Sequence, residues 1–202
     1  MKLLAPLAGM IFLATGPVFG AASNDPDWPC IQRKVPTLSP GVMWPHPMPE
    51  NGLTEETRAA VEETSDILAL RRVTLEEAEA AVARAEVAHP EFGRAEYGAI
   101  FARVFDRLNA RRNELMDGIA RYARNQARMA ENIEALRAQM KRLESAESPD
   151  FDRIDKVEAE LDWHERIFTD RARSLRYVCE TPVLLEQRIY AIAQMLLARV
   201  DE

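Results

Sequence analysis

The chain has two cysteines, Cys30 and Cys179, one toward each end of the sequence. Their separation excludes a CxxC redox motif, and an isolated pair in an oxidising compartment most simply forms a disulfide. In the chain-entropy model, closing so long a loop stabilises the fold by on the order of 4 to 5 kcal/mol, an upper value that strain and residual structure reduce. We predict a structural disulfide, with free or reactive thiols as the alternative.

A second group of residues with possible chemistry lies in the segment Met-Trp-Pro-His-Pro-Met. Its Met43, His46 and Met48 carry thioether and imidazole groups, which suit Cu(I). The spacing belongs to no established metal motif, and methionines beside a tryptophan usually pack against it. We keep these three residues as weak candidates for a soft-metal site and predict no bound cofactor.

Acidic and basic side chains are interleaved between residues 141 and 156. The spacing of the acids is not that of an EF-hand loop, and the interleaved lysines and arginines favour a solvated, charge-paired surface over a calcium site. The residues that we take as candidates for contact with a partner are Arg142, Glu144, Glu147, Asp150 and Arg153.

Motifs for catalysis are absent from the sequence: it has no GxSxG, no glycine-rich phosphate loop, no HExxH and no CxxC. Besides His46, the histidines are His89, which precedes a proline at a predicted helix end, and His164, which lies on a predicted helix seam. A polar seam residue more often sets the register of two helices than acts as a ligand or base. We therefore predict that the protein is not an enzyme.

These residues are positioned by a long predicted helix from about 95 to 146, roughly 75 Å at ~1.5 Å per residue. Its apolar positions alternate at spacings of three and four from 97 to 143, which is the pattern of a narrow seam against a partner helix. Arg111 and Gln126 are polar members of this seam. The apolar face is wide before about residue 116 and narrow beyond 119, which predicts several neighbours for the first half and one for the second.

The segment 151–179 repeats the three-four spacing after a short turn at 145–150, so the two helices should pair antiparallel. This pairing would return Cys179 to near Gly118. Thr181 and Pro182 resemble an N-cap and a first-turn proline, which predicts a separate last helix over 183–200 in the centre of a bundle.

Two shorter helices are predicted before the long one. Thr54 caps the first, which should end near Arg72, and Thr74 with Glu77 forms a capping box for the second, which should end at His89. The segment 23–53 contains seven prolines together with apolar residues, and we predict an extended strap across the helices, pinned to Cys179.

The first 22 residues read as a secretory signal peptide, with one lysine, an apolar run and small residues at the end, and we expect cleavage after Ala22. The prolines and glycines in this run argue against a membrane anchor, so no membrane insertion is expected after cleavage. The chain has a net charge of -7. An acidic protein has no general electrostatic attraction to nucleic acid or anionic lipid, so neither is expected as a partner.

The predicted fold is all-α: a helical bundle base with a long antiparallel two-helix coiled-coil arm, preceded by an extended proline-rich strap. Its parts are a signal peptide (1–22), the strap (23–53), the base (54–116 with 180–202) and the hairpin arm (117–179). In outline the arm resembles the helical hairpins of periplasmic adaptor proteins and chaperones, a similarity of shape without shared motifs.

We expect a periplasmic or secreted adaptor or scaffold that binds another protein. A copper or small-ligand carrier and a general periplasmic chaperone are the alternatives, and pairing of the arm with a second copy stays open.

Overall fold

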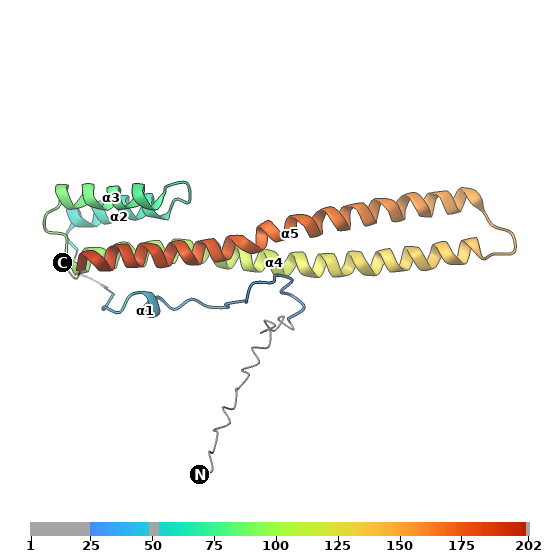
Figure 1. The fold of residues 1–202 in the computed structure, drawn as a ribbon, viewed down its shortest axis with the longest axis horizontal. Coiled ribbons are helices and arrows are strands. Elements are labelled where there is room, and N and C mark those ends of the chain that lie inside the picture. The colour runs from blue at the N-terminus through green and yellow to red at the C-terminus, as the bar shows by residue number, and fades with distance from the viewer. Residues whose placement is uncertain (1–24, 49–52, 201–202) are drawn as a thin grey trace, which may run out of the picture.

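The computed structural model describes residues 25–48 and 53–200, and within these ranges the regular elements are all helices. They are one turn, α1 (Pro40–Met43), two short helices, α2 (Glu55–Ala69) and α3 (Leu75–Ala88), and two long helices, α4 (Arg94–Glu144) and α5 (Phe151–Val200). The long helices run side by side, and α2 and α3 lie against them at one end only (Figure 1). The predicted all-α bundle with a two-helix arm is confirmed. The predicted signal peptide lies outside the described residues.

Helix α4 has 51 residues and follows the predicted range closely. It begins where the carboxylate of Glu96 accepts a hydrogen bond from the amide of Gly93 at 2.9 Å. It ends where the hydroxyl of Ser145 donates to the carbonyl of Lys141 at 2.7 Å. Asp150 then accepts from the amide of Arg153 at 3.2 Å and starts α5, so local hydrogen bonds build both sides of the tip turn.

The predicted break between 179 and 183 is wrong, because α5 is one helix of 50 residues with Pro182 inside it. A proline within a helix removes one backbone hydrogen bond and costs about 3 kcal/mol. Cys179 and Leu185 are both buried on either side of this proline, so packing on both sides holds the helix together. The ribbon of α5 shifts direction near its middle, as expected where a proline interrupts a helix (Figure 1).

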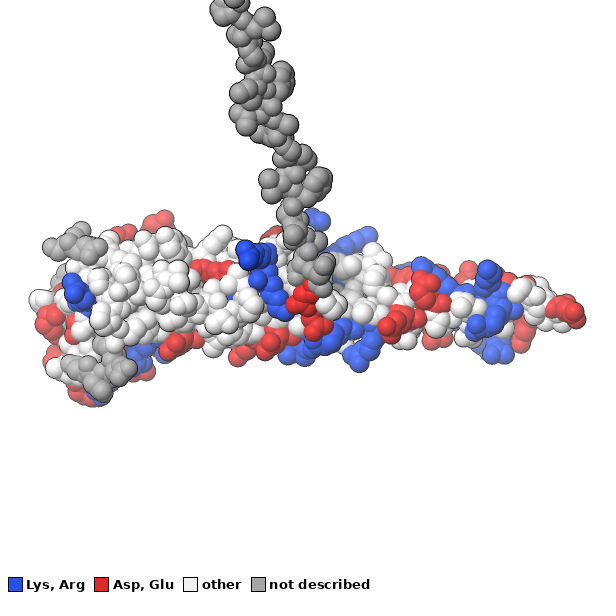
Figure 2. Space-filling view, turned by 90° about the horizontal axis from the view of Figure 1, so that it is seen from below, with Lys and Arg blue, Asp and Glu red and all other residues white. Residues whose placement is uncertain are grey.

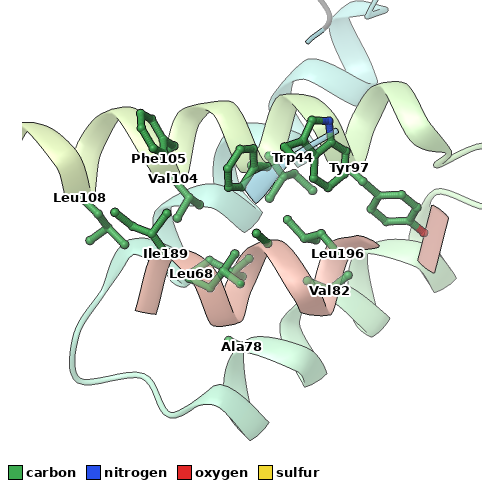
Figure 3. Close-up of a cluster of buried hydrophobic side chains, with 14 of the residues drawn as sticks. Trp44, Leu68, Ala78, Val82, Tyr97, Val104, Phe105, Leu108, Ile189 and Leu196 are labelled. Carbon is green, nitrogen blue, oxygen red and sulfur yellow. The ribbon is translucent and has the colours of Figure 1, made fainter. Parts of the chain in front are cut away.

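The core of the base lies where α2 and α3 cover the paired α4 and α5 (Figure 3). Capping fixes both short helices: Thr54 accepts from the amide of Thr57 at 3.2 Å, and Thr74 and Glu77 form the predicted capping box. The largest side chains buried between the four helices are Val61, Leu68, Val82, Ile100, Phe101, Leu185, Ile189, Ile192 and Leu196. The apolar last turns of α5 thus fill the centre of the base, as predicted for 183–200.

The strap, residues 25–48, runs along the long helices toward the base (Figure 1). The prediction of a wholly extended strap is wrong at one place, since Pro40–Met43 form a helical turn. Proline is tolerated there because the first helical position has no backbone partner to lose. Directly after this turn Trp44, with 1% of its surface exposed, stacks on Phe101 with ring centroids 5.3 Å apart. The strap is therefore part of the core.

Candidate interaction sites

The arm, residues 117–179, is fastened to the strap by the predicted disulfide between Cys30 and Cys179, whose Cα atoms are 5.6 Å apart. Both cysteines are buried in a small apolar cluster with Trp28, Met116 and Ile119. This contact confirms that the hairpin returns Cys179 to the middle of α4. A buried disulfide fits a protein of an oxidising compartment, extracellular or periplasmic. Among the described residues, no helix is apolar enough over a sufficient length to cross a membrane.

A buried arginine forms a second fastening beside the disulfide. Arg112 has no exposed surface, and its Nε donates to Oε1 of Glu186 on α5 at 2.6 Å. Its other nitrogens donate to the backbone carbonyl of Val35 in the strap and, at 3.2 Å, to Oδ1 of Asn113. One guanidinium therefore joins the strap, α4 and α5 where the base meets the arm. The seam prediction named its neighbour Arg111, which is exposed, so that assignment is wrong by one residue.

The shift from Arg111 to Arg112 has a geometric cause. Apolar spacing locates the face that packs on one partner helix, whereas this level of α4 is covered by both α5 and the strap. The buried face of α4 is therefore rotated toward the strap at this level. The spacing of apolar residues in α4 cannot predict this rotation, because this part of the strap is not helical and leaves no periodic pattern in the sequence of α4.

Another arginine ties α5 to the base. The guanidinium of Arg188 donates twice to the carbonyl of Leu68, at 3.0 and 2.8 Å, and once to that of Val73 at 2.8 Å. These carbonyls lie at the end of α2 and in the loop that follows, where helical partners are missing. Burial lowers the pKa of Arg188 from its usual value.

Helix α2 ends at Ala69, three residues before the predicted end at Arg72.

The seam of the arm is thinly packed beyond its root. Ala123, Ile133 and Val157 are the buried residues there, and around them the seam contains polar groups. The predicted seam residue Gln126 donates from Nε2 to the carbonyl of Phe168 at 3.2 Å, which fixes the register of the two helices. His164, also predicted on the seam, is half-buried and lies 4.0 Å from Glu160. The arm is therefore a pair held by few apolar contacts and several polar ones.

The five charged partner-contact candidates gather at the tip of the arm. All are exposed, and among the described residues none of them forms an ion pair within 4.0 Å; they are Arg142, Glu144, Glu147, Asp150 and Arg153. The tip turn brings together residues from both helices, with acids and bases mixed. This arrangement can contact a partner through charge, whereas the charge-paired surface predicted for it is not present within the tip.

The weak metal candidates lie around Trp44 at the base. Met43 and Met48 pack against the apolar core, and His46 meets the Trp44 ring edge-on with centroids 5.6 Å apart. Packing thus accounts for the positions of both thioethers. Among the described residues, no three histidine, cysteine or acidic side chains are grouped to hold a metal ion.

A polar hollow of about 410 Å³ opens at the end of the base, between α3, α4 and the last turn of α5. There Glu86 accepts a hydrogen bond from the Tyr97 hydroxyl at 2.8 Å and forms an ion pair with Nε of Arg199, also at 2.8 Å. Burial and the hydrogen bond to Glu86 raise the pKa of Tyr97 to about 12. The polar groups of Tyr97, Glu86 and Arg199 bind one another, so we interpret the hollow as a structural contact between the helices rather than as a reactive site.

No protein-family model matches the chain, and no curated protein or solved structure is similar to it. The chemistry and placement of its own residues are therefore the basis for a functional proposal.

Proposed function

We propose that this protein is an exported, non-catalytic adaptor or scaffold whose arm contacts another protein. The observation that carries the proposal is the arm itself: two long helices extend well beyond the core that stabilises the fold (Figure 1). They end in a charged tip whose five candidate residues form no ion pair among the described residues. A projection of this kind adds nothing to the core. It exposes a large surface at a distance from the base, which suits recognition of a partner.

The fastening at the root of the arm supports the same proposal. The Cys30–Cys179 disulfide and the Arg112–Glu186 pair join the strap to both helices at one level, so the arm is held at a defined angle to the base. Such rigidity reduces the conformational entropy lost when a partner binds. The buried disulfide and the signal-like first 22 residues both support an exported protein, in the periplasm or outside the cell.

The alternative of a copper or small-ligand carrier has less support. Met43 and Met48 would have to leave the core to coordinate a metal through their thioethers. The polar groups of the hollow beside Tyr97 already bond to each other, so a ligand there would have to displace them. A general chaperone would bind unrelated unfolded clients, and the test below separates that activity from a fixed partner.

The test is capture of partners by the full-length mature protein, using charge reversal at the tip. The tip variant Arg142→Glu/Glu147→Arg/Arg153→Glu changes exposed residues only. A matched control, Arg58→Glu/Glu63→Arg/Arg84→Glu, makes the same charge changes on the exposed surface of the base. We expect the wild type and the control to retain one stoichiometric protein partner from an envelope extract and the tip variant to lose it. Equal recovery with all three proteins would contradict a role for the tip.

A further inference from the structure

Basic side chains gather around the arm just beyond its root, although the chain as a whole is acidic. Seven exposed arginines surround the two helices there, and we call them the arginine belt: Arg121, Arg124 and Arg128 on α4, and Arg166, Arg171, Arg173 and Arg176 on α5. Within 121–128 and 166–176 the only acid is Asp170, so these segments carry a net charge of +6. Since the whole chain carries -7, all other residues together carry -13.

The two segments of the belt lie side by side. Gln126 from the first bonds to the carbonyl of Phe168 in the second, and the disulfide cluster joins Ile119 to Cys179 at their lower edge. Figure 2 shows basic side chains along the middle of the molecule, between a mostly uncharged base and the mixed charges toward the tip. On α4, the side chains of Arg121, Arg124 and Arg128 line a shallow hollow of about 470 Å³.

Among the described residues, most belt arginines have no acidic side chain within ion-pair distance. Arg124 pairs with Asp27 at 2.5 Å and Arg173 with Asp170 at 3.7 Å, while the other five form no ion pair among the described residues. Farther along the arm the pattern is different: Arg137 pairs with both Glu134 and Glu165 at 2.6 Å. Like charges three or four positions apart destabilise a helix, and α4 places Arg121, Arg124 and Arg128 at these spacings. The belt therefore gains stability from any anion that binds it.

We infer that the arginine belt is the docking site for an acidic polypeptide segment of the partner protein. The contact between Arg124 and Asp27 is an internal example of this chemistry, because a carboxylate from an extended segment already occupies one edge of the belt. Guanidinium groups match carboxylates in paired geometry, and all seven cations are arginine. The belt surrounds the arm, which suits a flexible chain that wraps it better than a flat membrane. This inference rests on the proposed function and specifies the chemistry of the partner.

The test measures binding of poly-L-glutamate to the full mature chain at low salt. The belt variant Arg121→Gln/Arg128→Gln/Arg166→Gln removes three cations that form no ion pair among the described residues. The matched control Lys141→Gln/Arg142→Gln/Arg153→Gln removes three cations at the exposed tip of the same arm. We expect about tenfold to hundredfold weaker binding for the belt variant and less than about twofold change for the control. Binding of the wild type should weaken as salt rises, because exposed charges are screened.

Two results would overturn the inference. One is an equal loss of affinity in both variants, which would indicate net charge without a site. The other is tighter binding of polyphosphate, or of vesicles containing phosphatidylglycerol, than of poly-L-glutamate at equal charge concentration, which would assign the belt to phosphate. Thermal unfolding serves as the control for correct folding. The belt variant loses repulsion between like charges, so its Tm should be at least as high as that of the wild type.

The same variants separate this inference from the proposed function. If the belt variant retains the partner that the tip variant loses, the belt inference fails and the adaptor role stands. If poly-L-glutamate requires the belt while neither variant loses a protein partner, the adaptor role fails and the belt remains a binding site for acidic chains.

Discussion

Removing the counter-charge of Arg112 is the most informative perturbation of this fold. The guanidinium is fully buried, and Glu186 is the acid that pairs with it. Glu186→Met keeps the length of the side chain and leaves Arg112 with only the Val35 carbonyl and the Asn113 amide oxygen as acceptors. Arg112→Met removes the cation instead, and the double variant removes both charges.

The expected losses of unfolding free energy follow from the burial of the ion pair. Breaking one partner from a buried ion pair costs about 3–5 kcal/mol, and we expect about 3 kcal/mol for Glu186→Met. The lower end applies because the Glu186 side chain is 24% exposed, so water partly solvates this site. Arg112→Met should cost about 1–2 kcal/mol, mainly the hydrogen bond to Val35, since the remaining Glu186 can hydrate. The double variant should also cost about 1–2 kcal/mol, which is less than Glu186→Met alone.

The assay is urea unfolding of the four proteins with the disulfide intact, so that the cross-link is the same in each. Thermal unfolding is the second measurement: for a protein of this size 1 kcal/mol shifts the Tm by about 2–4 °C, so Glu186→Met should lower the Tm by about 6–12 °C. Because the double variant should cost about as much as Arg112→Met alone, the double-mutant cycle should give a coupling energy of about 3 kcal/mol in magnitude. If the costs of the two single variants summed to the cost of the double variant within about 0.5 kcal/mol, the view that this pair is a coupled unit joining the strap and the helices would be refuted.

Three further predictions concern the disulfide, the hydrogen bonds of Arg188 and the hydroxyl of Tyr97. The Cys30→Ser/Cys179→Ser variant should lose about 2–5 kcal/mol of unfolding free energy, because the bridge spans 149 residues. Denaturant titration without reductant measures this loss, and an unchanged midpoint would contradict it. Arg188→Met leaves carbonyls at the end of α2 without donors, so it should cost about 2 kcal/mol and speed hydrogen exchange in the last turn of α2 relative to α3. Because the folded-state pKa of Tyr97 is raised from 10.0 to about 12, its contribution is complete below pH 10 and is lost as pH rises through 12. The stability gap between wild type and Tyr97→Phe should therefore shrink over that range, by at most about 2–3 kcal/mol, and a gap that widened would refute the assignment.

Much of this architecture follows from local rules. The three-four spacing locates α4 and most of α5, because a helix that buries one seam leaves that period in the sequence. The Thr74–Glu77 capping box is equally local and marks the start of α3. The disulfide is predictable for a different reason: with two cysteines, only one pairing exists.

The misplaced helix end at Pro182 arises from a competition that local rules do not weigh. Thr181–Pro182 is a good helix start, yet the apolar positions before and after it lie on one buried side of a single helix. Tertiary packing offsets the lost hydrogen bond. Thr181 also donates from its hydroxyl to the carbonyl of Tyr177 at 3.3 Å, so its side chain bonds backward along the helix rather than capping a new one.

The arginine belt could not be found from composition. Its segments are separated by almost forty residues, and the net charge of the chain has the opposite sign. Pairing of α4 with α5 brings the two segments to one level. The expectation that an acidic chain attracts no polyanion rests on the average charge, which does not describe the local charge of this part of the surface.

The order of the chain along the core has a consequence for biosynthesis. Leu185, Ile189, Ile192 and Leu196 occupy the centre of the base, yet they are synthesised more than 80 residues after Ile100 and Phe101, which they cover. Until they are available, Ile100 and Phe101 on α4 have no α5 to cover them. Cys30 likewise waits for a partner that is synthesised 149 residues later. The core of the base therefore cannot close before residues 185–196 have been synthesised, and until then the apolar face of α4 lacks its α5 partner.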